Sequence, residues 1–174
     1  FIIKISLFVS FNDLVDDNGV IIQDHVYQVR TMFFNLGIDP DLVDALADWM
    51  DKDNKPAGVS GAEDSAYYSQ DYEVKNARLD NWSELKLILG FDYQVLAKLK
   101  ETTAIYKSTS GKININTATV ETLKALFPDM TDQDAEILIE DRENTPFETA
   151  SDITSYIRAQ PWNDPKGISR LSVK

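Results

Sequence analysis

Strand-like segments at the two ends of the chain enclose segments with helical periodicity, and this order most constrains the fold. Near the start, Ile3, Ile5 and Leu7 alternate with polar residues, and the turn signal Asp-Asp-Asn-Gly at residues 16–19 precedes a further apolar run. The final segment, ISRLSVK at residues 168–174, alternates in the same way, and we expect its strand to continue beyond Lys174. Strands at the ends and helices between them predict an α+β fold, in which a helical domain is inserted into a small sheet.

Capping residues place the starts of several helices in the middle of the chain. Side chains of this kind accept hydrogen bonds from free backbone N–H groups in the first helical turn, which makes them helix-start signals. The predicted caps are Asp24, Asp39, Asn81, Asp92 and Thr149. Residues 52–80 have no helical period and are predicted to be irregular, and PWNDPKG at residues 161–167 is predicted to break the last helix.

The stretch KININTATVETLKALFPDMTDQDAEILIEDR, residues 112–142, predicts two short helices joined by a tight hairpin. Segments of this shape often hold the DNA backbone, but the chain has 29 acidic and 17 basic residues and a formal net charge of −12. Because phosphate binding depends on clustered Lys and Arg, this balance argues against a nucleic-acid partner.

Acidic residues are concentrated at residues 39–84, which contain 12 Asp or Glu and only 4 Lys or Arg. Four of them recur at helical spacing and share one helix face, namely Asp41, Asp44, Asp48 and Asp51. Like charges at this spacing destabilise a helix unless something neutralises them. The following loop adds Asp53, Glu63 and Asp64, and oxygen ligands in an irregular loop suit calcium.

The acidic loop does not follow the EF-hand pattern. Asp51 and Asp53 fit its first and third ligand positions, but Lys55 occupies the fifth, Pro56 replaces the required glycine and Ala62 occupies the twelfth. The spacing by itself is compatible with a calcium loop of another design and with a solvated acidic face.

The residues needed for common catalytic sites are missing from the sequence. His25 is the sole histidine, it has no candidate nucleophile near it in sequence, and cysteine is absent. A general base needs a positioned partner and zinc sites need Cys or several His, so neither chemistry is predicted. No phosphate-binding loop occurs either. The sequence therefore predicts a protein that is not an enzyme.

The sequence contains no run of about 20 apolar residues, the length that a membrane-spanning helix requires. The chain begins at Phe1 without Met or a signal peptide, and we interpret it as a processed or excised part of a longer protein. The lack of an anchor in this chain therefore does not show that the parent protein lacks one.

A combined motif in the acidic segment resembles a known family. The pattern D-W-x-D-x-D, a nearby Pro and then G-A-E-D-x-x-Y occurs within residues 48–67, and SELKLILGF and KININTA follow it in order. This combination is similar to the K-type minor pseudopilins of bacterial type II secretion, the general secretion pathway protein K family. The segment SQDYEVKN at residues 69–76 departs from the family, because it lacks the Pro and Arg that members commonly have there.

The resemblance implies a fold and a domain organisation. It implies a pilin-like antiparallel sheet with a large inserted helical domain that contains a helix-hairpin-helix-like segment. Residues 1–23 would form pilin-like strands, and residues 169–174 would begin the last strand. Residues 24–168 would form the inserted domain, which includes the acidic loop.

The resemblance also implies a function. The family's members are non-enzymatic subunits that cap the tip of the type II secretion pseudopilus with the I-type and J-type minor pseudopilins and the major pseudopilin. This chain would be the periplasmic domain of a protein anchored in the inner membrane by an N-terminal helix that the chain lacks. It would bind calcium, and the implied ligand candidates are Asp48, Asp51, Asp53, Glu63 and Asp64.

An alternative resemblance concerns the hairpin segment, which is also similar to the helix-hairpin-helix DNA-binding module of competence-type DNA receptors. In the DNA-binding form, two glycines of the turn let backbone N–H groups approach phosphate. Here Asp129 and Thr131 replace these glycines, and Asp134 replaces a lysine. Because carboxylates repel phosphate, the sequence predicts that the hairpin is a packing element and that the protein does not bind nucleic acid.

Overall fold

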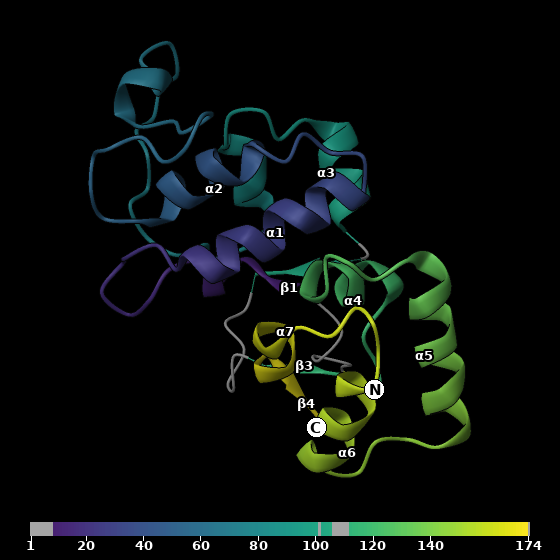
Figure 1. The fold of residues 1–174 in the computed structure, drawn as a ribbon. Helices are drawn as coiled ribbons and strands as arrows, with labels where there is room; N and C mark the ends of the chain where they lie inside the picture. Colours follow the sequence, from purple (N-terminus) through teal and green to yellow (C-terminus); the bar gives the residue numbers. More distant parts are fainter. Residues whose placement is uncertain (1–8, 101, 106–111, 174) are drawn as a thin grey trace. The chain divides into compact units, whose positions relative to one another are not determined.

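The computed structural model describes residues 9–100, 102–105 and 112–173, and the chain divides into two compact units (Figure 1). The first unit consists of residues 10–107. The second unit consists of residues 1–9 together with residues 108–174. The strand predicted at residues 3–7 lies outside the described residues.

The first unit begins with a 3-10 helix, η1 (Phe11–Leu14), followed by a reversal of the chain. Val15 and Ile21 form an isolated antiparallel bridge across this reversal. The carboxylate of Asp16 accepts hydrogen bonds from the backbone N–H groups of Asn18 at 2.8 Å and Val20 at 2.9 Å. A carboxylate that bonds the backbone two residues onward is typical of a turn, so the turn predicted at residues 16–19 is confirmed.

Two helices follow, α1 (Gln23–Asn35) and α2 (Leu42–Met50). The prediction that Asp24 caps α1 is wrong, because the helix begins at Gln23 and Asp24 lies within its first turn. The prediction that Asp39 caps the next helix is also wrong, because α2 begins at Leu42 and its N-cap residue is Asp41. The Asp39 carboxylate accepts a hydrogen bond from the backbone N–H of Asp41 at 3.0 Å, which holds residues 39–42 in a turn before the helix.

Residues 52–80 are largely irregular, as predicted, and the rest of the first unit has short elements. They are η2 (Asp64–Tyr67), η3 (Trp82–Leu87), α3 (Tyr93–Leu99) and β2 (Thr103–Ala104), which pairs with β1 (Val9–Ser10). Two predicted caps are confirmed. Asn81 accepts a hydrogen bond from the Ser83 N–H at 3.0 Å, and Asp92 accepts one from the Val95 N–H at 2.9 Å. The segment after Asn81 is a 3-10 helix rather than an α-helix.

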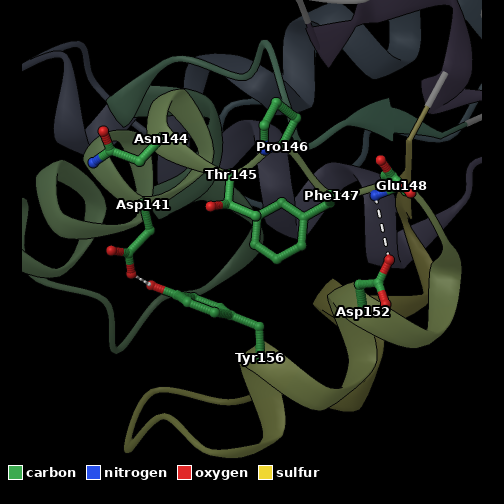
Figure 2. Close-up of a pocket in the computed structure, with 8 residues that line it drawn as sticks. All are labelled: Asp141, Asn144, Thr145, Pro146, Phe147, Glu148, Asp152 and Tyr156. Atoms are coloured by element: carbon green, nitrogen blue, oxygen red, sulfur yellow. Dashed lines mark hydrogen bonds between the residues drawn. The ribbon is translucent and has the colours of Figure 1, made fainter.

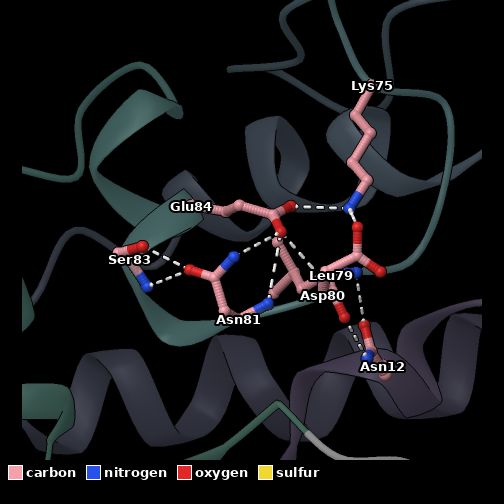
Figure 3. Close-up of polar contacts among 7 residues, drawn as sticks. All are labelled: Asn12, Lys75, Leu79, Asp80, Asn81, Ser83 and Glu84. Atoms are coloured by element: carbon pink, nitrogen blue, oxygen red, sulfur yellow. Dashed lines mark hydrogen bonds and ion pairs between the residues drawn. The ribbon is translucent and has the colours of Figure 1, made fainter.

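A polar network holds the end of the irregular region against η1 (Figure 3). The side-chain amide of buried Asn12 donates to the Leu79 carbonyl at 2.8 Å and accepts from the Leu79 N–H at 2.8 Å. The Lys75 ammonium contacts the Asp80 and Glu84 carboxylates, each at 2.8 Å. Both backbone groups of Leu79 are therefore satisfied by one side chain that lies 67 residues earlier in the sequence.

Replacing Asn12 by Ala is expected to lower the free energy of unfolding by about 2–3 kcal/mol, because a buried donor and a buried acceptor lose their partner. Denaturant titration followed by circular dichroism measures this change. Asn18→Ala is the matched control, since the Asn18 side chain makes only an exposed contact of 3.5 Å with Asp16. The control is expected to change stability by less than about 0.5 kcal/mol. Equal effects of the two substitutions would contradict the role of Asn12.

Aromatic side chains join η1, α1 and η3 in the core of the first unit. The Phe11 ring lies 6.2 Å from the Phe33 ring in an edge-to-face arrangement and 6.4 Å from the Trp82 ring in a stacked one. Phe33 also packs edge-to-face on Phe91 at 6.1 Å. Each such pair stabilises the fold slightly beyond the burial of the two rings. The cluster therefore stabilises the elements that position α2.

The second unit is mostly helical. Its elements are β3 (Ile113–Asn114), α4 (Val120–Leu126), α5 (Asp132–Asn144), α6 (Ala150–Arg158), α7 (Pro165–Ser169) and β4 (Leu171–Ser172). The two helices predicted within residues 112–142 are α4 and α5, which pack against each other. The capping box predicted at Thr149 and Asp152 is confirmed at the start of α6.

The C-terminal part differs from the prediction in two respects. The predicted helix break contains the start of α7, because Asp164 accepts a hydrogen bond from the Lys166 N–H and Pro165 occupies the first helical position. Of the predicted strand at residues 168–174, residues 168–173 are described, and within them the strand forms at Leu171–Ser172. It pairs with Ile113–Asn114, and this pairing is parallel.

The described residues thus form a mixed helical fold with two small two-stranded sheets. This agrees with the predicted combination of helices and strands. The pilin-like antiparallel sheet and the division at residues 23 and 168 stay predictions. Among the described helices, none has both the length and the apolar character needed to cross a membrane.

Candidate metal centre

Helix α2 brings acidic side chains into the interior of the first unit. Residues 43–50 are all buried, and this stretch includes Asp44 and Asp48. Asp51 follows the last helical residue and is buried as well. Three residues of the predicted acidic face, Asp44, Asp48 and Asp51, therefore lie away from solvent, where a charge needs a partner, whereas Asp41 is partly exposed.

Asp44 has its charge neutralised within the protein. Its carboxylate forms an ion pair with Arg30 of α1 and accepts hydrogen bonds from the backbone N–H groups of Val59 at 2.9 Å and Ser60 at 3.3 Å. Arg30 also pairs with Asp41. A carboxylate with this many donors is a structural residue that joins α1, α2 and the loop.

Three other carboxylates converge, and no basic side chain in the described part of the chain pairs with them. One oxygen each from Asp48, Asp51 and Glu63 lies within 4.8 Å of the other two. The exposed fractions of these residues are 0%, 3% and 5%, respectively. Glu63 comes from the loop, so the cluster joins the end of α2 to a segment more than ten residues later.

The hydrogen bonds around the cluster satisfy only part of it. Asp48 accepts from the backbone N–H of Ala57 at 2.9 Å and from that of Ala62. In contrast, one carboxylate oxygen of Asp51 and both of Glu63 are buried and have no hydrogen-bond partner among the described residues. Buried acceptors without a donor are costly, so these oxygens require either protons or a cation.

The electrostatics of the cluster also indicate that its carboxylate oxygens require protons or a cation. Burial, reinforced by the neighbouring carboxylates, raises the pKa of Glu63 to about 7 and the pKa of Asp51 to about 6. Burial also raises the pKa of Asp48, against hydrogen bonds from Ala57 and Ala62 that lower it. Desolvation and like charges both disfavour the ionised form, and a bound divalent cation would remove both penalties.

Gly58 and Gly61 let the loop backbone lie close to the carboxylates of Asp44 and Asp48, respectively. A Cβ atom at Gly61 would lie 2.6 Å from an Asp48 carboxylate oxygen and 2.3 Å from the Ala57 carbonyl oxygen. Gly58 has φ of +53°, and a Cβ atom there would lie 2.2 Å from the Asp44 carboxylate. Only glycine fits at such close approach, so the loop shape depends on both positions.

The remaining two predicted ligands lie outside this cluster of three. Asp53 is exposed and accepts a hydrogen bond from the Lys55 N–H at 2.8 Å. Asp64 accepts one from the Val74 N–H at 3.0 Å. The structure therefore brings together Asp48, Asp51 and Glu63, and it places Asp53 and Asp64 in the turns that shape the surrounding loop.

An aromatic wall next to the cluster was not predicted as part of the site. The ring of Trp49 lies 5.6 Å from the ring of Tyr67 and 6.1 Å from that of Tyr72. The Tyr72 hydroxyl donates to the Leu87 carbonyl at 3.0 Å, and the Leu89 N–H donates to the Tyr67 hydroxyl at 3.1 Å. Trp49 is a core residue, and the two tyrosines come from a segment whose sequence carries no periodic signal.

In the hairpin between α4 and α5, Thr131 does not offer its backbone N–H group to a phosphate. Its N–H donates to the Asp134 carboxylate at 2.9 Å, and its hydroxyl donates to the same group at 2.6 Å. These hydrogen bonds lower the pKa of Asp134, which keeps it negatively charged. This local geometry favours the prediction that the hairpin does not bind nucleic acid.

Comparisons with known proteins agree over most of the chain. Two family models, both described as protein K of the type II secretion system, match residues 10–108 and 113–174. Type II secretion system protein K of Pseudomonas aeruginosa is 31% identical over 140 residues, which cover 77% of this chain and 41% of that protein. The Klebsiella pneumoniae protein of the same name is 28% identical over 171 residues, covering 88% and 52%. The chain spans about half the length of the curated relatives it matches.

A solved structure has a similar fold. It is a chain from the crystal structure of the GspK-GspI-GspJ complex of the enterotoxigenic Escherichia coli type 2 secretion system. The TM-score is 0.73 at 24% sequence identity, over 97% of this chain and 62% of that chain.

Proposed function

The chain belongs to the type II secretion system protein K family, and we propose from this premise that it acts as a minor pseudopilin in protein export. The observation that carries the proposal is the match of the two family models, which together cover nearly all of residues 10–174. In this role the protein is a non-enzymatic subunit that caps the tip of the type II secretion pseudopilus. The similar fold of a chain from the GspK-GspI-GspJ complex supports the assignment.

The proposed partners are the I-type and J-type minor pseudopilins and, through them, the major pseudopilin. The crystallised complex with the similar fold contains GspK, GspI and GspJ, which motivates this choice. The proposed location is the periplasm, with an N-terminal helix outside this chain as the inner-membrane anchor. The pilin-like antiparallel sheet predicted for residues 1–23 and 169–174 belongs to the same proposal.

The proposed cofactor is a structural calcium ion. Its ligands would include Asp48, Asp51 and Glu63, because three buried and partly unpaired carboxylates provide the oxygen donors that calcium prefers. Asp53 and Asp64 remain ligand candidates from the surrounding loop. The ion would neutralise the buried charge and would join the end of α2 to the loop that contains Glu63.

The raised pKa values of Asp51 and Glu63 also occur in acid–base catalysts, so an enzymatic function needs to be weighed. A catalytic carboxyl group must reach the atom whose proton it transfers. Both residues are buried, which closes them to a substrate of any size. Their environment fits a structural ion better than a reaction.

Co-purification tests the partner assignment. The full-length protein, expressed with its I-type and J-type partners, is expected to elute with both in size-exclusion chromatography. Each partner omitted in turn provides the control for pairwise binding. Elution of the protein alone, with the two partners in a separate complex, would contradict the proposed assembly.

A further inference from the structure

A cavity of about 560 Å³ lies in the second unit, between the C-terminal end of α5 and the first turns of α6 (Figure 2). Its walls include the aromatic side chains of Phe147 and Tyr156 and the carboxylates of Asp141, Glu148 and Asp152. Among the described residues that line it, none is Lys, Arg or His. The cavity is thus a concave site lined by aromatic and acidic side chains. Its residues lie in a different part of the sequence from the acidic loop.

Hydrogen bonds hold the aromatic part of the cavity in place. The Asn116 side chain donates to the Phe147 carbonyl at 2.8 Å and accepts from the Phe147 N–H at 2.9 Å. The Phe147 and Tyr156 rings pack edge-to-face, with centroids 5.3 Å apart. The Tyr156 hydroxyl donates to the Asp141 carboxylate at 2.6 Å. A site fixed in this way loses little conformational freedom when it binds a ligand.

The carboxylates around the cavity are available to a cation. Asp152 belongs to the capping box at the start of α6, and the hydrogen bonds from Thr149 lower its pKa, so it is ionised at neutral pH. Burial and the neighbouring Asp141 raise the pKa of Tyr156, which keeps its hydroxyl protonated as a hydrogen-bond donor to Asp141. Among the described residues, the Glu148 carboxylate has no hydrogen-bond or ion-pair partner. These charges attract a cationic group.

We propose that this cavity binds an arginine side chain presented by an exposed segment of a partner protein. A guanidinium group stacks on aromatic faces and donates several hydrogen bonds in one plane, whereas a lysine ammonium is a point charge that suits this combination less well. The volume accommodates an arginine together with its flanking backbone. The net charge of −12 favours the approach of a basic segment. The proposal does not depend on the proposed role in secretion.

Nuclear magnetic resonance titration of the full 174-residue chain tests this site. The probes are the peptide acetyl-Gly-Arg-Gly-amide and its citrulline analogue, which has nearly the same shape but no charge. The arginine peptide is expected to shift the backbone amide signals of residues 141–156, and the citrulline peptide is expected to leave them unchanged. Glu148→Gln is expected to weaken binding about fivefold, the loss typical of one partly exposed ion pair.

Glu136→Gln is the matched control, because Glu136 is an exposed acidic residue of α5 outside the cavity. It is expected to leave the affinity unchanged. Equal weakening by both substitutions would show non-specific attraction to an acidic protein and would overturn the site. Binding of the citrulline peptide would overturn the proposed occupant. Shifts of the signals of residues 141–156 that are caused by magnesium or calcium chloride alone, or that depend only on protein concentration, would overturn it as well.

Discussion

Calcium is expected to raise the free energy of unfolding of the metal-free chain by about 3–4 kcal/mol at a free concentration of about 100 to 1,000 times the dissociation constant. The physical reason is that the ligand set of Asp48, Asp51 and Glu63 exists only in the folded protein, so an ion bound there stabilises the native state alone. For a unit of roughly 100 residues, this corresponds to a melting temperature higher by on the order of 10–20 °C. Thermal unfolding in calcium and in a chelator measures the difference.

Substitutions in the loop identify the ligands. Glu63→Gln keeps the side-chain shape but removes a charge whose two oxygens lack other partners, and we expect it to abolish most of the calcium-dependent increase. Glu73→Gln is the matched control, because Glu73 is exposed in the same irregular region and lies outside the cluster. Magnesium is expected to stabilise less, since it requires a smaller octahedral site. A melting temperature that is the same in calcium and in chelator would refute the metal centre.

In the absence of calcium, stability is expected to decrease as the pH rises from about 4 to about 7. Folding raises the pKa of Asp51 from 3.8 to about 6 and that of Glu63 from 4.5 to about 7. A carboxyl group with a raised pKa in the folded state favours folding below its unfolded pKa and loses that contribution as the pH passes through the folded value. One pKa unit corresponds to about 1.4 kcal/mol, and water entering the metal-free cluster limits the combined loss to on the order of 3 kcal/mol.

Calcium is expected to reverse this pH dependence. Protons compete with the ion for the same oxygens, so the stabilisation by calcium grows over the range in which the carboxyl groups ionise. Denaturant titrations at several pH values, with calcium and with chelator, should therefore give two curves that diverge toward neutral pH. In chelator, Glu63→Gln should reduce the dependence of stability on pH, whereas Glu73→Gln should leave this dependence unchanged. Parallel curves would contradict the assignment of these groups as ligands.

Local sequence signals predicted much of the secondary structure. The turn at residues 16–19 and the caps at Asn81, Asp92 and Thr149 depend on hydrogen bonds between residues two to four apart, and the structure contains them. The predicted cap at Asp24 is wrong because a single acidic residue near a helix start also fits within the first turn. The start of α7 was missed because Pro165 was interpreted as a break, although Pro is also favoured at the first helical position.

The sequence predicted which acidic residues are candidate ligands but not how they are arranged in space. The acidic motif identified five ligand candidates, and the structure gathers three of them, Asp48, Asp51 and Glu63, into a buried cluster. Sequence spacing could not separate Asp44 from these three, because its ion pair with Arg30 depends on how α1 packs on α2. It also could not predict that Tyr67 and Tyr72 would pack against Trp49, since no periodic pattern relates them.

The sequence by itself determined the mixture of helices and strands, the acidic loop and the resemblance to the protein K family, because these depend on local preferences and on a contiguous motif. Only the tertiary structure decided which charges are paired and which are buried alone. It also decided that Leu171–Ser172 pairs in parallel with Ile113–Asn114. The reason is the same in both cases: burial and long-range pairing depend on segments that lie far apart in the chain. The pKa of a carboxylate and the pairing partner of a strand are therefore fixed only when the chain has folded.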